Sequence, residues 1–183
     1  MSKSLQFESL SDEELAKQAA SGSADHFEII VHRYSGAMYR VAYSFCHNTA
    51  EAQDLTQETF VKLFKALPKA KLDLPFKPWL YKIAINNALS HIRKKQEKHQ
   101  VDWTETETTL ASDDPTDAIV KQNDLQIAID KLPFDYQQMI ILRAVEELSF
   151  EEISGVLDIP AATARTKFSR AKKQLRAILS SRE

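Results

Sequence analysis

The sequence predicts an all-α fold in which two helical domains are joined by an acidic flexible linker. First, only three of the 183 residues are glycine, and the helix-forming residues Ala, Leu, Lys, Glu and Gln are frequent. Second, apolar residues recur at spacings of three and four in several segments, which is the helical period. Third, residues 97–117 are acidic, rich in threonine and without that period, which predicts a linker.

This linker separates predicted domains at residues 1–96 and 118–183. In the first domain, capping signals and apolar periodicity predict four helices, over about 10–20, 24–45, 48–67 and 75–99. In the second domain they predict an apolar helical face within 125–132 and a helix over 134–147, followed by two more helices. No internal repeat is found, so the domains are expected to differ in structure.

The most informative segment is 149–176, whose pattern predicts a helix-turn-helix. Ser149 and Glu152 have the spacing of a capping box, so the first helix begins there. Pro160 disfavours helix at the residue before it and suits the first turn of the second helix. The second helix has one apolar stripe, made of Ala164, Phe168, Ala171, Leu175 and Ile178. Its polar side is cationic, which suits the major groove of DNA, although a basic face can also be merely solvated.

The formal net charge of −2 is unevenly distributed along the chain. Residues 1–96 sum to +3, residues 97–124 to −6 and residues 125–183 to +1. The stretches 74–96 and 159–182 contain no acidic residue. Because local fields of one sign steer phosphate more than the total charge does, both stretches are candidate nucleic-acid surfaces.

Other features indicate the compartment and exclude some classes of protein. Cys46 is the single cysteine, so an internal disulfide is impossible and a reducing cytoplasm fits. The first residues lack the apolar segment of a signal peptide, and no apolar run approaches the roughly 20 residues that cross a bilayer. We therefore expect a cytoplasmic protein without membrane insertion. The sequence contains no Gly-rich phosphate loop and no metal-binding histidine spacing, so we expect neither an enzyme, nor a cofactor, nor a metal site.

The predicted helix at 52–67 mixes apolar and charged residues on its surface. Its core-facing set is Phe60, Leu63, Phe64 and Leu67. Its other faces carry Asp54, Gln57, Glu58 and Lys62, with Leu55 and Val61 among them. This mixture is typical of a protein interface, although an ordinary amphipathic helix fits it equally well.

The predicted helix at 75–99 combines aromatic side chains, cations and amides. It carries Phe76, Lys77, Trp79, Tyr81, Lys82, Asn86, Asn87 and Arg93. Aromatic and cationic groups together can stack on unpaired bases, and amides can bind base edges. Alternatively, Trp79 belongs to the core.

Two blocks of sequence resemble the extracytoplasmic-function sigma factors, a class of specificity subunits of bacterial RNA polymerase. Residues 52–60 (AQDLTQETF) and 76–86 (FKPWLYKIAIN) are similar to sigma region two. Leu132-Pro133, residues 148–153 (LSFEEI) and residues 159–171 are similar to sigma region four. The blocks follow in the family's order and span about residues 10–180.

The resemblance implies a role for each block, and for each residue at a matching position. The helix that docks on the polymerase clamp coiled coil would contain Asp54, Leu55, Gln57, Glu58, Val61 and Phe64. Recognition of the melted −10 element would use Lys77, Trp79, Lys82, Asn86, Asn87 and Arg93, with the loop from Lys71 to Lys77. Recognition of the −35 element would use Thr163, Arg165, Thr166, Lys167, Ser169, Arg170 and Lys172.

The implied partners are core RNA polymerase, through its clamp coiled coil and flap, promoter DNA and an anti-sigma factor. The implied location is the cytoplasm, in association with the nucleoid. A stand-alone helix-turn-helix repressor or activator is the alternative function. Such proteins usually dimerise on two half-sites and need no polymerase for tight binding.

Overall fold

The computed structural model describes residues 10–70, 75–99 and 125–180. Within these ranges the chain is helical and contains no strand, which confirms the predicted all-α fold. The linker predicted at 97–117 falls mostly outside the described residues, and so do residues 71–74 of the DNA-binding loop expected from Lys71 to Lys77. No helix in the described ranges is both long enough and apolar enough to span a membrane.

The N-terminal domain is built from α2 (Asp12–Ala20), α3 (Ala24–Cys46), α4 (Thr49–Ala66), the short 3-10 helix η1 (Leu67–Lys69) and α5 (Phe76–His99). Side-chain caps begin two of these helices. The Ser11 hydroxyl accepts a hydrogen bond from the Glu14 backbone, and Glu14 accepts one from the Ser11 backbone, which completes a capping box. Asn48 caps α4 by accepting from the backbone N–H of Glu51 at 3.0 Å.

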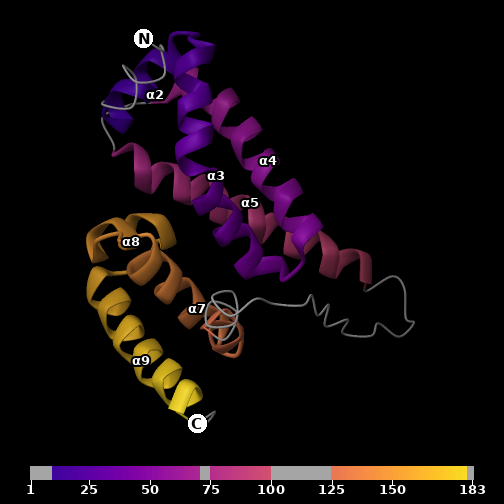
Figure 1. The fold of residues 1–183 in the computed structure, drawn as a ribbon, viewed down its shortest axis with the longest axis vertical. Helices are drawn as coiled ribbons and strands as arrows, with labels where there is room; N and C mark the ends of the chain where they lie inside the picture. The colour runs from indigo at the N-terminus through magenta and orange to yellow at the C-terminus, as the bar shows by residue number, and fades with distance from the viewer. Residues whose placement is uncertain (1–9, 71–74, 100–124, 181–183) are drawn as a thin grey trace, which may run out of the picture.

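Helix α3 lies at the centre of this domain, in contact with α2, α4 and α5 (Figure 1). Its apolar face is buried against theirs, with Ile30 and Met38 almost fully enclosed. A polar contact fixes α2 to α3, because Asp12 accepts from the Tyr34 hydroxyl and pairs with Arg33. Helices α4 and α5 pack against α3 on one side, and each exposes its other side to solvent.

The C-terminal domain contains helical residues 125–130, then α7 (Phe134–Ile140), the π-helical turn η2 (Ile141–Val145), α8 (Phe150–Leu157) and α9 (Ala161–Ser180). One prediction differs here, because the single helix expected over 134–147 is α7 followed by η2. The Glu146 backbone N–H donates to the carbonyl of Ile141, five residues earlier, at 2.9 Å. This wider turn ends the helix, and Glu147 then adopts a left-handed backbone with φ 59°.

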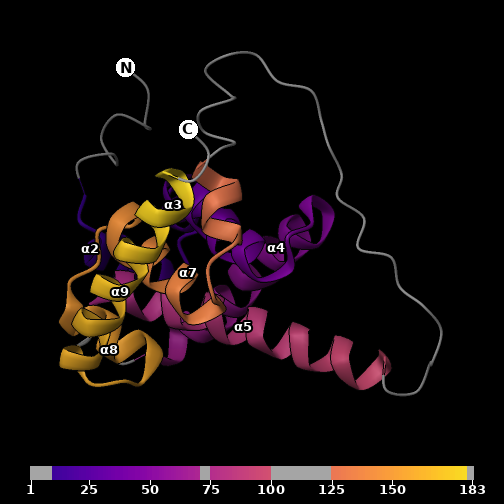
Figure 2. The same ribbon diagram turned by 90° about the horizontal axis from the view of Figure 1, so that it is seen from below.

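The two domains pack against each other in this structure (Figure 2). Helix α5 contacts α8, and α3 contacts α7. The rings of Phe45 and Phe134 meet edge to face at 4.9 Å, and the buried apolar cluster continues from one domain into the other. His47, at the end of α3, pairs with Asp130 of the C-terminal domain at 3.5 Å. The outer face of α5 is therefore partly covered by α8.

Candidate nucleic-acid interface

Helices α8 and α9 form the predicted helix-turn-helix. The capping box at the start of α8 is present, with the Ser149 N–H donating to Glu152 at 2.6 Å and the Glu152 N–H donating to Ser149 at 3.1 Å. Asp158 ends α8 in a left-handed conformation, with φ 53°, and Pro160 precedes α9. Ala164 and Ala171 are fully buried. These small side chains let α9 approach its neighbours closely and leave its cationic side outward.

The outward side of α9 carries the residues predicted to contact the −35 element. Exposed members are Arg165, Thr166, Ser169, Arg170 and Lys172, while Thr163 and Lys167 are half-buried. Lys167 is paired with Asp135 at 2.5 Å, and Arg165 lies 3.7 Å from Glu151. Exposed ion pairs of this kind contribute little to stability, so a phosphate can replace the carboxylate at modest cost.

Aromatic rings orient two of these cations. The Arg165 guanidinium lies over the ring of Phe150 at 5.2 Å, and the Lys172 ammonium lies over Phe168 at 4.9 Å. Cation–π contact limits the motion of a long side chain. The charged groups are thus held close to the helix surface, where DNA would meet them.

Helix α5 brings the residues predicted for −10 recognition onto neighbouring turns. Asn86 and Arg93 are exposed, and Lys77, Trp79 and Lys82 are half-buried. Trp79 meets Phe76 edge to face at 6.1 Å and packs against the apolar core, as the core alternative expects, while its half-buried side chain keeps some exposure. Lys77 and Lys82 already have partners in the C-terminal domain.

The expectation for Asn87 is corrected by the structure. This side chain is only 3% exposed, and its amide donates to the Leu55 carbonyl and the Thr59 hydroxyl of α4. Its oxygen accepts from the Lys62 ammonium. Asn87 therefore joins α5 to α4 and faces away from any DNA surface, whereas its neighbour Asn86 faces outward. One helical step of about 100° separates the two positions.

Helix α4 presents the surface predicted to bind polymerase. Asp54, Gln57 and Glu58 are exposed. Val61 and Phe64 are also exposed, at 51% and 55%, which is high for apolar side chains. Phe64 was expected in the core-facing set, yet it lies on the outer edge of that set. We call Asp54, Gln57, Glu58, Val61 and Phe64 the α4 surface.

Leu55 does not belong to the α4 surface, which is a second correction. It is 2% exposed and packs with Ala42 and Ala52 in a small cluster between α3 and α4. The resemblance placed Leu55 among the polymerase contacts because it lies within the matching motif. Its position on the helix directs it inward.

The described residues contain no group of three or more His, Cys, Asp or Glu side chains that is arranged to hold a metal ion. Burial raises the pKa of the Cys46 thiol, which also donates to the carbonyl of Ala42. The protonated thiol is a weak nucleophile.

Comparison with known proteins identifies the family of this chain. Residues 30–98 match the family model of sigma-70 region 2, and residues 122–175 match that of sigma-70 region 4. The chain is also 34% identical over 172 residues to the ECF RNA polymerase sigma factor SigW of Bacillus subtilis, covering 87% of this chain and 92% of that protein. The chain belongs to the extracytoplasmic-function (ECF) sigma factors. This sigma factor is thus a transcription initiation factor, and the family assignment favours that function over a stand-alone repressor or activator.

Other relatives also match this sigma factor over most of its length. It is 28% identical over 180 residues to the ECF sigma-E factor of Escherichia coli K12, covering 92% of this chain and 94% of that protein. Among solved structures, CnrH in complex with the cytosolic domain of CnrY has a TM-score of 0.73 at 26% identity, covering 94% and 99% of the two chains. The sigma factor RpoE of Bartonella quintana, in complex with the anti-sigma factor NepR, has the same fold, with a TM-score of 0.75 at 23% identity. The match covers 84% of this chain and 96% of that chain.

Sequence reasoning did not single out Glu146 of this sigma factor. Its carboxylate is 6% exposed and accepts from Arg40 and Tyr81 of the N-terminal domain. Burial, together with the hydrogen bond to Glu146, raises the pKa of Tyr81, so the phenol remains a donor. An acidic residue at the end of an apolar helix ordinarily faces solvent, so only the π-turn and the domain packing reveal this contact.

Proposed function

We propose that this sigma factor binds core RNA polymerase through the α4 surface. The observation that carries the proposal is the pair of exposed apolar side chains, Val61 and Phe64, among acidic and amide groups on one helix. Aromatic and aliphatic groups with a polar rim are typical of binding hot spots. A complementary partner would offer an apolar pocket with basic groups around it, as we expect of the clamp coiled coil.

Promoter recognition is proposed to divide between α5 and α9. Helix α9 would enter the major groove of the −35 element, with Arg165, Ser169 and Arg170 toward the bases and Lys167 and Lys172 on phosphates. Helix α5 would bind the melted −10 element through Lys77, Trp79, Lys82, Asn86 and Arg93, excluding Asn87. Each good arginine–guanine pair supplies only about 1–3 kcal/mol of discrimination against the wrong base, so selective promoter binding needs the −35 and −10 elements together.

Two further partners are part of the proposal. The flap of the polymerase would contact the C-terminal domain, and an anti-sigma factor would hold the protein inactive. Two structural relatives motivate the second of these partners: RpoE of Bartonella quintana was solved with the anti-sigma factor NepR, and CnrH was solved with the cytosolic domain of CnrY. We infer from these proposed partners that the protein acts in the cytoplasm, on the nucleoid.

The test is multi-round transcription with bacterial core polymerase on sheared genomic DNA, followed by sequencing of the transcripts. We expect discrete start sites that share two upstream elements. The double variant Val61→Ala/Phe64→Ala should lose both core binding in gel filtration and transcription. Gln18→Ala, an exposed change on α2, is the control and should behave as the unmodified protein. Absence of stimulation and of core binding in the unmodified protein would refute the proposal.

A further inference from the structure

The buried face of α5 is wide and centred on small side chains. Its apolar members, each 0% to 4% exposed, are Phe76, Leu80, Tyr81, Ala84, Ile85 and Ala88. At about 100° per residue, these positions cover about half of the helix circumference. Ala84 and Ala88 lie near the middle of this face, and alanines form low ridges that interlock weakly with a neighbouring helix. Apolar packing alone therefore sets the rotation of α5 about its axis only loosely.

A polar contact with α4 sets this rotation more sharply. Asn87 is 3% exposed, and its amide nitrogen donates to the Leu55 carbonyl at 3.1 Å and to the Thr59 hydroxyl at 3.2 Å. Its oxygen accepts from the Lys62 ammonium. We call these three hydrogen bonds the Asn87 joint. Because hydrogen bonds are directional, the joint fixes both the distance and the angle between this side chain and α4.

Lys62 is the exposed member of the Asn87 joint. Its side chain is 44% exposed, whereas Thr59 is 2% exposed. The Lys62 ammonium also pairs with Glu58 Oε1 at 3.1 Å. A glutamate four residues before a lysine is the favourable order for an ion pair on a helix. The two partners together limit the rotamers of this long side chain and hold its charge beside Asn87.

The Lys62 contact is better suited to orient Asn87 than to stabilise the fold. An exposed ion pair contributes little to stability. If the ammonium is removed, water can reach the Asn87 oxygen from the exposed side and replace the lost hydrogen bond. Water does not hold the amide at one angle to α4, however. Substitution of Lys62 should therefore loosen the joint without unfolding the domain.

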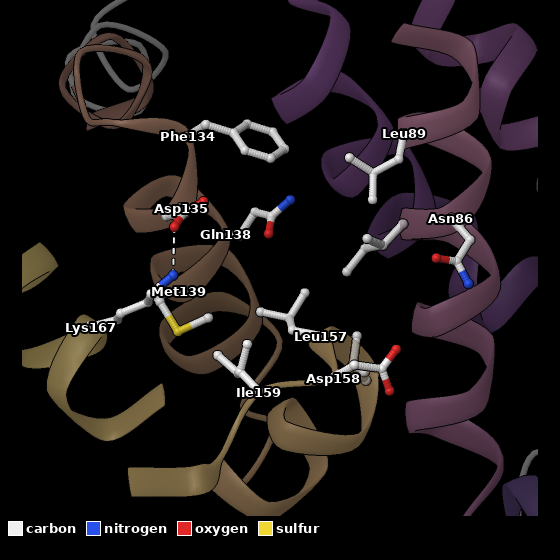
Figure 3. A pocket seen from close by; sticks show the side chains of 12 residues that line it. Asn86, Leu89, Phe134, Asp135, Gln138, Met139, Leu157, Asp158, Ile159 and Lys167 are labelled. Atoms are coloured by element: carbon white, nitrogen blue, oxygen red, sulfur yellow. Dashed lines mark hydrogen bonds and ion pairs between the residues drawn. The ribbon is translucent and has the colours of Figure 1, made fainter. Parts of the chain in front are cut away.

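The rotation of α5 determines what Asn86 can contact. Asn86 is exposed, and Figure 3 shows it with Leu89 on the α5 side of a groove between this helix and the C-terminal domain. Because Asn86 and Asn87 are consecutive, the rotation that the joint fixes for one also fixes the direction of the other. A hydrogen bond weakens steeply as its angle departs from linear, so an amide that contacts a base needs this precision.

We propose that Lys62 is a positioning residue for recognition of the −10 element: its bridge from Glu58 to Asn87 fixes the rotation of α5 that directs Asn86 to the DNA. The proposal rests on the proposed −10 function of Asn86. It assigns Lys62 no contact of its own with DNA or polymerase, although the residue lies next to the α4 surface. Recognition of a base by one helix thus depends on a side chain of the neighbouring helix.

The test compares Lys62→Met, Lys62→Arg and Lys65→Met in the full chain. Lys62→Met keeps a long side chain and removes its donors, while Lys62→Arg retains a charged donor. Lys65→Met is the matched control, because it removes the same charge from α4 and leaves the hydrogen bonds of Asn87 in place. Each protein is assayed with core polymerase on promoters that carry each base in turn at every −10 position, with Asn86→Ala as the reference.

Asn86→Ala should abolish the preference at one position, which identifies the base that Asn86 contacts. At that position, Lys62→Met should reduce the ratio of transcription from the best to the second-best base about fivefold, the lower end of what one good base contact supplies. Lys62→Arg and Lys65→Met should keep the parent ratio. A parent ratio in Lys62→Met, beside a lost preference in Asn86→Ala, would overturn the proposal. An unchanged preference in Asn86→Ala would refute the −10 function of Asn86 itself.

NMR of the free, ¹⁵N-labelled protein measures the joint without DNA or polymerase. The side-chain amide protons of Asn87 should exchange with water about tenfold faster in Lys62→Met than in the parent, because local opening becomes easier. Lys65→Met should show the parent rate. Equal rates in all three proteins would show that Lys62 does not hold the amide, which would overturn the proposal. Faster exchange with unchanged base preference would overturn the link to Asn86.

Core polymerase affinity separates positioning from direct contact. Lys62→Met should bind core polymerase within about twofold of the parent in a fluorescence titration, since it leaves the exposed apolar groups of the α4 surface in place. Urea denaturation should give nearly the parent stability. A tenfold or greater loss of affinity would place Lys62 in the polymerase interface, and unfolding of the variant would make its role structural. Either result would overturn the proposal.

Discussion

The ring of Phe64 meets the ring of Phe27 edge to face at 5.1 Å, although 55% of the Phe64 side chain is exposed. One side of Phe64 is thus supported by α3, and the other is free to enter a pocket on a partner. A supported aromatic group loses little conformational freedom on binding, which favours a hot spot.

We expect Phe64→Ala to weaken core polymerase binding by about 1–2 kcal/mol or more, because it removes the contact group itself. Phe27→Leu should weaken binding less, since it removes only the edge support. Affinity measured by fluorescence titration with core polymerase distinguishes the two. A larger effect of Phe27→Leu would indicate that Phe64 acts through the fold and not at the interface.

The adjacent residues Asn86 and Asn87 should respond in opposite ways to substitution. Asn87→Ala removes hydrogen bonds to Leu55, Thr59 and Lys62, and it should lower the free energy of unfolding by about 1–3 kcal/mol. Asn86→Ala should leave stability nearly unchanged and reduce transcription from −10-dependent promoters. Urea denaturation and promoter assays on both variants check this pair. Equal stability of the two variants would contradict the assigned burial.

The His47–Asp130 pair provides a pH-dependent interdomain contact. The hydrogen bond to Asp130 raises the pKa of His47, more than partial burial lowers it, and the ring of Tyr43 is its other close neighbour. Because the folded pKa is raised, the pair's contribution is fully present below the ordinary pKa of about 6.5 and is lost as the pH rises through the raised value. Domain packing should therefore be more stable at pH 6 than at pH 8.

NMR titration of the His47 imidazole measures this effect directly. Its pKa should fall toward the ordinary value in Asp130→Asn. A raised pKa that persists in Asp130→Asn would show that another group is responsible.

Arg170 provides a test of −35 recognition on the exposed side of α9. Arg170→Ala should lower discrimination at one or two base pairs of the −35 element by about 1–3 kcal/mol. Arg176→Ala removes the same charge six residues further along the helix and should weaken binding without changing the sequence preference. Aligned start sites from sequenced transcripts show which outcome occurs. Unchanged preference in Arg170→Ala would remove this residue from the base-contacting set.

Helix positions and caps were predictable from the sequence because they depend on local patterns. Ser11 with Glu14, and Ser149 with Glu152, form the expected capping boxes. Burial within a motif was less predictable. Leu55 and Asn87 both fall in segments that match the family, yet their side chains turn toward α3 and α4, and motif matching does not encode helix rotation.

The contact of Glu146 with Arg40 and Tyr81 was not predictable for a different reason. It depends on two features that arise only in three dimensions, namely the π-turn after Ile140 and the packing of α8 on α5. Arg40 and Glu146 are 106 residues apart in sequence. Neither the helical periodicity of the sequence nor the helix propensity of its residues indicates that these two side chains meet.

The buried network around Asn87 also constrains how relatives of this protein can diverge. A substitution at position 87 removes one hydrogen-bond partner each from Lys62 and Thr59, which favours matching changes on α4. Asn86 contacts none of these groups and can be exchanged independently. Two neighbouring positions on one helix therefore differ in how freely they can change: the outer one, proposed to contact the −10 element, lies outside this network, while the inner one preserves the joint between α4 and α5.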